Sequence, residues 1–133
     1  MSVAVLLVTH NDIGAQLKQA AGAIFKQDMP ALETISIPAD LAVEDLGKYA
    51  DLVRESIQQQ NRGDGVLVLT DLHGATPSNL ARHFCNGSDA CVVSGVNLPM
   101  LLRVLNYTAQ PLQELAETAV CGGKSGVTRD NHD

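Results

Sequence analysis

The apolar run VAVLLV, at residues 3–8, is the sequence feature that most constrains how this chain can fold. A strand that is apolar at every position has both of its faces covered, which is typical of a central strand in a parallel sheet. Two residues beyond the run stands His10, where a strand of this kind would end. The pattern therefore predicts a buried central strand that delivers a histidine to the start of the next helix.

The rest of the sequence alternates between helical and strand patterns. Apolar residues at helical spacing predict a helix from Ile13 to about Phe25, with Asn11 or Asp12 capping its first turn through a side-chain oxygen. A second apolar run, VLVLT at residues 66–70, is followed by Asp71 and predicts another doubly buried strand. The other expected elements are a more exposed strand at 32–37, an amphipathic helix at 43–57, the second buried strand at 66–70, a short helix ending near 84 and a strand at 90–93.

Strands joined through helices run parallel, and such crossovers are right-handed in nearly all known cases. The expected fold class is therefore α/β: a single domain over residues 1–133, with a doubly wound, mainly parallel sheet and helices on both of its faces. Ligands of such sheets bind outside the carboxyl ends of the strands, where the strand order reverses. His10, Asp71 and the SGVN loop with Asn97 are all expected at that edge, which makes it the candidate site.

The segment DLHGATPSN, at residues 71–79, has the sequence of a helix start suited to an anion. Thr76 is predicted to cap the helix, and Pro77 suits its first position because the missing N–H has no partner there. Gly74 and Ala75 keep the loop slim, so that a bulky group can approach its amides. Free amides and the positive end of the helix dipole favour an anion, for which phosphate is the natural candidate. The alternative is an ordinary capped helix after a strand.

His10 and Asp71 together form a candidate nucleophile and its partner. Neutral imidazole is nucleophilic through one nitrogen when the other nitrogen carries the proton and is held by an acceptor. Asp71 is expected to be that acceptor, to fix the tautomer and to stabilise the cation that forms when the ring is phosphorylated. The alternative for His10 is a solvated loop histidine.

Two other chemistries would use the same edge of the sheet. His10, Asp12, Asp71 and His73 are a set of side chains that could hold a divalent metal in a hydrolase. A receiver-type module would instead be phosphorylated on Asp71, but it needs a second acidic pair after the first strand and a lysine at a later strand end, which this sequence does not supply. Phosphotransfer through His10 requires no metal and no cofactor.

Composition excludes several classes of function. The net charge is −6 without a Lys/Arg cluster and 3% of residues are aromatic, so nucleic acid is not an expected partner. No apolar run approaches the roughly 18 residues needed to span a membrane, and no basic stretch of a signal peptide opens the chain, so we expect a cytoplasmic protein. The cysteines form no CxxC pair, which argues against a structural zinc site or a disulfide framework: Cys85, Cys91 and Cys121.

Three stretches of the chain resemble the IIA component of the mannose class of the bacterial sugar phosphotransferase system. They are LLVTHNDIG at 6–14, GVLVLTDLHGATPSN at 65–79 and SGVNLPMLLRVL at 94–105. The resemblance implies a phosphoryl carrier in which His10 accepts phosphate from the histidine-containing phosphocarrier protein and passes it to a IIB component, for sugar uptake or for regulation. Asp71 is then the partner of the histidine, and the implied phosphate-binding residues are Gly74, Ala75, Thr76 and Ser78.

The resemblance also implies an assembly. Family members are typically dimers that exchange a C-terminal strand, for which SGVTR at 125–129 is the matching candidate, within a tail at 120–133 that begins with a flexible glycine stretch. Peripheral association with a membrane permease is a further expectation. His73 stands where the best-known sugar-transporting members carry a large aromatic residue, and His73 and Asn97 are expected at the pocket rim or in a partner contact. A dihydroxyacetone-kinase phosphocarrier subunit shares the fold and the histidine, but the GATPSN loop fits the mannose class better.

Overall fold

The computed structural model describes residues 2–26 and 28–131. Its centre is a four-stranded sheet in the order β2-β1-β3-β4, and each neighbouring pair of strands is parallel. The predicted α/β class with a parallel sheet is thereby confirmed. The strands are β1 (Ala4–His10), β2 (Leu32–Ile37), β3 (Val66–Thr70) and β4 (Ala90–Ser94).

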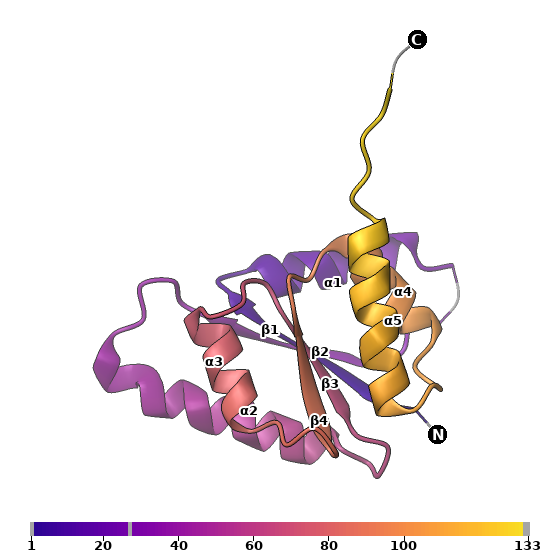
Figure 1. Cartoon of the computed structure of the whole chain (residues 1–133). Helices are drawn as coiled ribbons and strands as arrows, with labels where there is room; N and C mark the ends of the chain where they lie inside the picture. The colour runs from indigo at the N-terminus through magenta and orange to yellow at the C-terminus, as the bar shows by residue number, and fades with distance from the viewer. Residues whose placement is uncertain (1, 27, 132–133) are drawn as a thin grey trace.

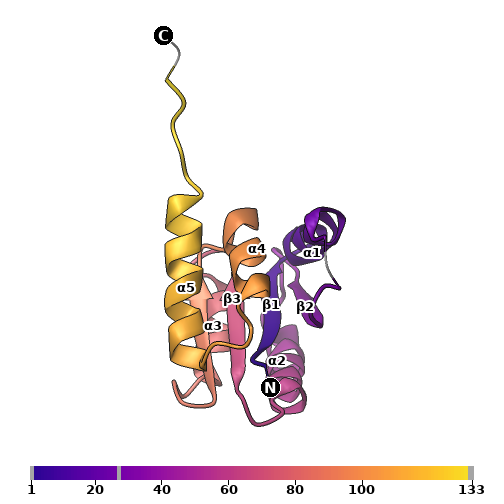
Figure 2. The same cartoon turned by 90° about the vertical axis from the view of Figure 1, so that its right-hand side faces the viewer.

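Helices cover both faces of this sheet, as Figures 1 and 2 show. One layer contains α1 (Ile13–Ile24), α4 (Leu98–Asn106) and α5 (Leu112–Ser125), and the other contains α2 (Leu46–Gln60), which follows a short 3-10 turn at Val43–Asp45, and α3 (Thr76–His83). Each layer encloses its own hydrophobic core against the sheet. The sheet is therefore buried on both faces, which is what a doubly wound fold requires.

The two central strands divide their side chains between the two cores. In β1, Val5 and Leu7 face the layer of α1, α4 and α5, whereas Leu6 and Val8 face α2 and α3. All four side chains are buried. This arrangement explains why the run at residues 3–8 is apolar at every position instead of alternating.

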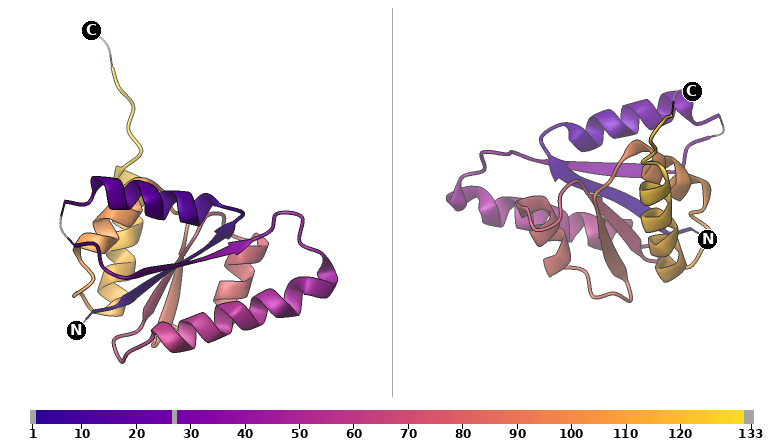
Figure 3. Two further views of the ribbon diagram at one scale, coloured as in Figure 1. Left: turned by 180° about the vertical axis from the view of Figure 1, so that it is seen from behind. Right: turned by 45° about the horizontal axis from the view of Figure 1, so that its top comes forward.

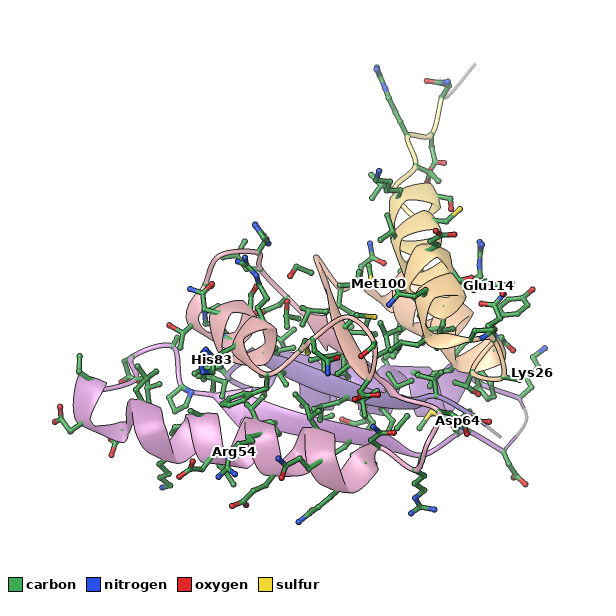
Figure 4. All side chains as sticks on the ribbon, turned by 60° about the horizontal axis from the view of Figure 1, so that its bottom comes forward. Lys26, Arg54, Asp64, His83, Met100 and Glu114 are labelled. Atoms are coloured by element: carbon green, nitrogen blue, oxygen red, sulfur yellow. The ribbon has the colours of Figure 1, made fainter. Side chains whose placement is uncertain are left out.

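The final helix, α5, was not expected from the sequence. Its last turns include Gly122 and Gly123, which we predicted to be a flexible stretch leading into the tail. A Cβ atom on Gly122 would lie 2.9 Å from Arg103 Cβ, and one on Gly123 would lie 2.7 Å from Met100 Cε, so the missing side chains allow α5 to pack closely on α4. Figure 4 shows Met100 of α4 beside α5.

The tail beyond α5 differs from its prediction. Ser125 is the last residue of the helix, and residues 126–131 form no strand within this chain. They are exposed and project away from the folded body, as Figure 1 and the left view of Figure 3 show. Strand exchange between two copies therefore stays a proposal. In the described ranges, the helices are too short or too polar to cross a membrane.

Candidate functional site

The candidate site lies at the carboxyl ends of the two central strands. From β1 the chain moves first to β2 on one side and later to β3 on the other, so the strand order reverses between β1 and β3. His10 is the last residue of β1, and Asp71 follows the last residue of β3. Because parallel strands end at the same edge, the fold brings together two residues that are 61 positions apart in the chain.

His10 and Asp71 are in direct contact. Nδ1 of His10 lies 2.8 Å from Oδ2 of Asp71, and the same oxygen accepts a hydrogen bond from the backbone N–H of His10 at 3.2 Å. The side chains are 24% and 12% exposed, so the pair is partly shielded from water but can still be reached by a partner. One carboxylate oxygen thus holds both the ring and the main chain of the histidine.

This contact decides which ring nitrogen is free. A carboxylate only accepts hydrogen bonds, so Nδ1 must carry the hydrogen that it donates to Asp71. Nε2 then has the unshared electron pair, and within the part of the chain that the structure describes it has no hydrogen-bond partner. Nε2 is therefore the atom of His10 that can act as a nucleophile.

The second oxygen of Asp71 is in an unusual position. Oδ1 is buried and has no hydrogen-bond partner among the described residues. A buried carboxylate oxygen without a partner is costly, and it makes a neighbouring positive charge more favourable. Asp71 is thus arranged to stabilise a positively charged His10 ring.

The turn after His10 is fixed by Asn11. This residue has a positive φ of 45°, its backbone N–H donates to Ile37 O at 2.8 Å, and its side-chain Oδ1 accepts from the N–H of Ala39 at 3.0 Å. The prediction that Asn11 or Asp12 caps α1 through its side chain is wrong, because Asn11 bonds to the segment after β2 and Asp12 makes no side-chain cap bond. Asn11 instead ties the His10 turn to the neighbouring strand.

Thr9 does the capping that was expected of its neighbours. Its buried Oγ1 accepts a hydrogen bond from the N–H of Gly14, in the first turn of α1, at 2.8 Å. This role of Thr9 was not predicted from the sequence. The available signal was a hydroxyl residue between the strand and the helix start, close enough along the chain to reach a free amide.

The loop between β3 and α3 carries the predicted anion site. Gly74 has a φ of 85°, a conformation that favours glycine, and it is exposed with open space where a Cβ would stand. The helix begins one residue earlier than predicted, so Ala75 is the N-cap, Thr76 is the first helical residue and Pro77 the second. Thr76 is half-buried and makes no side-chain cap bond, which corrects its predicted role as the cap.

Ser78 lies beneath this loop and not on its surface. Its side chain is fully buried, and its Oγ lies 3.4 Å from the backbone N of Gly74 and 3.4 Å from Oγ of Ser94. Ser94 Oγ in turn lies 2.8 Å from Oγ1 of Thr70. The hydroxyl is enclosed and supports the loop from below, which argues against the predicted direct contact of Ser78 with phosphate.

His73 and Asn97 have different surroundings. His73 is exposed in the β3–α3 loop. Asn97 is the N-cap of α4: its Oδ1 accepts from Met100 N at 2.9 Å, and its Nδ2 donates to Gly123 O at 3.1 Å. Both ends of its amide are thus occupied, one in capping α4 and one in joining α4 to α5, which argues against the predicted role of Asn97 in the pocket or in a partner contact.

The alternative metal site is not formed. Within residues 2–26 and 28–131, no three His, Cys, Asp or Glu side chains are grouped closely enough to hold a metal ion. His10 and Asp71 meet, whereas Asp12 and His73 are exposed on separate loops. The arrangement also disfavours Asp71 as a phosphoryl acceptor, because Oδ2 is occupied by His10 and Oδ1 is buried.

A family model and a relative from Bacillus subtilis both match most of this chain. The family model EIIA-man, described as PTS system fructose IIA component, matches residues 4–120. The PTS system fructose-specific EIIA component of Bacillus subtilis (strain 168) is 29% identical over 105 residues, which are 78% of this chain and 69% of that protein.

Solved structures share the fold. The mannose/sorbose specific IIA subunit of the phosphotransferase system from Enterococcus faecalis superposes with a TM-score of 0.80 and 24% identity, over 100% of this chain and 98% of the other. The phosphotransferase system component EIIA from Streptococcus agalactiae gives a TM-score of 0.76 and 20% identity, over 96% of each chain.

Proposed function

Because this chain belongs to the EIIA-man family of IIA components of the sugar phosphotransferase system, we propose that it carries a phosphoryl group on Nε2 of His10. The resemblance predicted from the sequence motifs is confirmed by the family match. In the proposed cycle the histidine-containing phosphocarrier protein is the donor and a IIB component is the acceptor. The cycle serves either sugar uptake or regulation.

The observation that carries this proposal is the contact of 2.8 Å between Nδ1 of His10 and Oδ2 of Asp71. The unshared pair on Nε2 attacks the phosphorus of the donor phosphohistidine, a new N–P bond forms, and the electron pair of the breaking N–P bond stays on the donor nitrogen. The proton remains on Nδ1, so the His10 ring becomes positively charged. Asp71 stabilises that charge, much as the aspartate of a catalytic triad stabilises its imidazolium.

The β3–α3 loop is the proposed binding site for the phosphoryl oxygens. Gly74, Ala75 and Thr76 stand at the start of α3, where backbone amides and the helix dipole favour negative charge, and α3 packs against β1. The positive φ of Gly74 lets the loop turn without a side chain over its amides. Ser78 and Ser94 support the loop from below and do not contact the phosphoryl group.

The remaining partners follow from the same proposal. His73 is exposed beside the loop and shapes the rim of the site or the contact with a protein partner. Residues 126–131 are exposed, with a β-branched pair at Val127 and Thr128, and they pair with the sheet of a second copy in a homodimer. The dimer acts in the cytoplasm and docks at the surface of a membrane permease when it serves uptake.

Phosphorylation of this protein by the purified phosphoryl-donor proteins tests the proposal. Incubation with phosphoenolpyruvate, enzyme I and the phosphocarrier protein is expected to add one phosphoryl group per chain, as seen by mass spectrometry, and the His10→Ala variant is expected to add none. Peptide mapping under mildly alkaline conditions should find the label in the peptide that contains His10, because phosphohistidine survives base and an acyl phosphate on Asp71 does not. An unchanged mass of the parent protein, or label elsewhere, would overturn the assignment.

A further inference from the structure

A groove runs along the edge of the sheet between β2 and α2, and neither His10 nor Asp71 lines it. It encloses about 360 Å³. Figure 3 shows β2 at the border of the sheet, with α2 alongside. Its wall on the helix consists of residues at i, i+3, i+4 and i+7, which lie on one face of α2. The lining residues are Glu33, Thr34, Ile35 and Ser36 of β2 and Leu52, Glu55, Ser56 and Gln59 of α2.

The backbone of β2 is open on the side of the groove. Within the described sheet, β2 pairs with β1 and has no strand on its other side. A strand in this position presents a row of N–H and C=O groups that a further strand can pair with. The groove therefore offers main-chain hydrogen bonds as well as side chains.

Ser56 has a buried hydroxyl that the fold leaves unused. The residue is 8% exposed, and its Oγ has no hydrogen-bond partner among the described residues. It lines the groove next to Leu52, whose side chain is 43% exposed although it is large and apolar. A buried unpaired hydroxyl lowers stability unless another group bonds to it. An exposed apolar side chain and a buried, unpaired hydroxyl thus lie side by side at the groove.

The charge of the groove selects its occupant. The two charged lining residues, Glu33 and Glu55, are both acidic. One Glu33 oxygen accepts a hydrogen bond from Nε2 of Gln60 at 3.2 Å, but the Gln60 amide is uncharged and leaves the negative charge of Glu33 in place. Two copies of this chain paired edge to edge would bring these carboxylates together, within a chain of net charge −6. Like charges across paired strands are destabilising and protect an edge against self-association. A basic segment would be attracted instead.

We propose that this groove binds an extended, basic segment of a partner protein, which adds to the sheet as a strand beside β2. A lysine or arginine of the segment lies between Glu33 and Glu55, and an aliphatic residue two positions along contacts Ile35 and Leu52. Ser56 Oγ, which is buried in the free chain, turns toward the segment and bonds to one of its polar groups. Residues two apart in a strand share a face, so one short segment satisfies both contacts. The site is separate from the phosphoryl pocket at His10.

A capped synthetic peptide, Thr-Lys-Thr-Val-Thr-Lys-Thr, is the probe for this proposal, with Lys, Val and Lys on one face. Titrated into the full chain, it is expected to shift the amide resonances of residues 33–36 and of α2. Glutamate in place of both lysines should abolish the shifts, and so should N-methylation at alternate backbone positions. Equal binding of the glutamate peptide, or shifts centred on the His10 loop, would overturn the proposal. Shifts of residues 33–36 that depend on protein concentration without peptide would show a second copy as the occupant and would also overturn it.

Matched variants identify the contacts. Glu33→Gln with Glu55→Gln is expected to weaken peptide binding about fivefold and to reduce its salt dependence. The control is Glu114→Gln with Glu117→Gln, which makes the same charge change on exposed residues of α5, and should leave binding unchanged. Figure 4 labels Glu114 on α5, away from α2. Equal losses in both double variants would show a general charge effect and contradict a specific groove.

Ser56→Ala separates a binding role from a structural one. The variant should raise the thermal stability of the free protein, because it removes a buried hydroxyl without a partner. It should also weaken peptide binding about fivefold, because it removes a hydrogen bond to the peptide. A more stable variant with unchanged peptide affinity would show that the hydroxyl does not take part in binding.

Discussion

Oδ2 of Asp71 accepts from two donors of His10, Nδ1 at 2.8 Å and the backbone N–H at 3.2 Å. The first contact sets the tautomer of the ring, and the second holds the end of β1 at a fixed distance from the end of β3. Asp71 therefore fixes both the protonation state and the position of the His10 ring.

The first prediction concerns this carboxylate. The Asp71→Asn variant should fold like the parent but accept phosphate at least about 100-fold more slowly. The reason is that an amide can donate to Nδ1 and leave the proton on Nε2. In a catalytic triad, the wrong histidine tautomer lowers the rate by up to about 10⁴-fold. Quench-flow or gel assays of phosphotransfer measure the rate, and nitrogen NMR of the imidazole reports the tautomer. Equal rates for the variant and the parent would remove Asp71 from the mechanism.

The second prediction concerns the other histidine near the site. His73→Phe should keep phosphorylation within about tenfold of the parent, which corresponds to less than about 1.4 kcal/mol of activation free energy. The reason is that His73 is exposed and has no acceptor in the described residues to orient its ring, whereas a positioned nucleophile gains several powers of ten. His10→Phe is the matched control and should be inactive. Label recovered in the peptide that contains His73 would contradict the assignment.

The third prediction tests the cap at Thr9. Thr9→Val removes the hydroxyl that accepts from Gly14 N and leaves that amide unpaired in a buried place, so the free energy of unfolding should fall by about 1–3 kcal/mol. Thr9→Ser keeps the hydroxyl and should lose much less. Urea unfolding followed by circular dichroism measures both. A valine variant as stable as the parent would mean that the bond contributes nothing.

The fourth prediction concerns assembly. A chain that ends at Ser125 keeps all of α5 and loses only the exposed tail, so it should fold normally but dimerise more weakly than the full chain. Analytical ultracentrifugation over a range of concentrations gives the dissociation constant, and circular dichroism checks the fold. If the shortened chain sediments as an equally stable dimer, the tail does not join the two copies.

The fifth prediction follows from the buried thiols. Burial, together with the neighbouring Cys91 thiol, raises the pKa of Cys85 from 9.0 to about 12, and burial also raises the pKa of Cys91. Thiol reagents at neutral pH should therefore label the exposed Cys121 well before the other two.

The same shift predicts how stability depends on pH. Between about pH 9 and pH 12 the unfolded chain releases the Cys85 proton while the folded chain keeps it, so the free energy of unfolding should fall as the pH rises through this window. Cys85→Ala should flatten that dependence. An unchanged slope in the variant would show that other groups cause the alkaline loss.

The strands and the site pair could be predicted because local patterns report them directly. A short run that is apolar at every position is typical of a strand covered on both faces, and the parallel topology then brings the strand ends at His10 and Asp71 to one edge. The more exposed strand predicted at 32–37 is the edge strand β2, in which Glu33 and Ser36 are exposed between the buried ends Leu32 and Ile37. These features depend on burial along one segment and on the rule that strands joined through helices run parallel.

The features that were missed depend on contacts between distant segments. Gly122 and Gly123 have low helix propensity, and their place in α5 makes sense only once the close approach of α4 is known. Asn97 stands at a loop of the candidate edge, but its amide joins two helices that the sequence did not pair. The resemblance assigned Ser78 to the phosphate, whereas its burial beneath the loop depends on packing that the sequence does not show.

The separation of His10 and Asp71 by 61 positions has a consequence for the newly made protein. During synthesis the histidine emerges early, and its carboxylate partner is added only when the chain reaches the end of β3. The pair forms when β3 inserts beside β1, so a chain arrested after its first strand–helix–strand unit holds the histidine without the group that sets its tautomer. Only chains in which β3 has joined β1 therefore hold His10 in the tautomer that leaves Nε2 free.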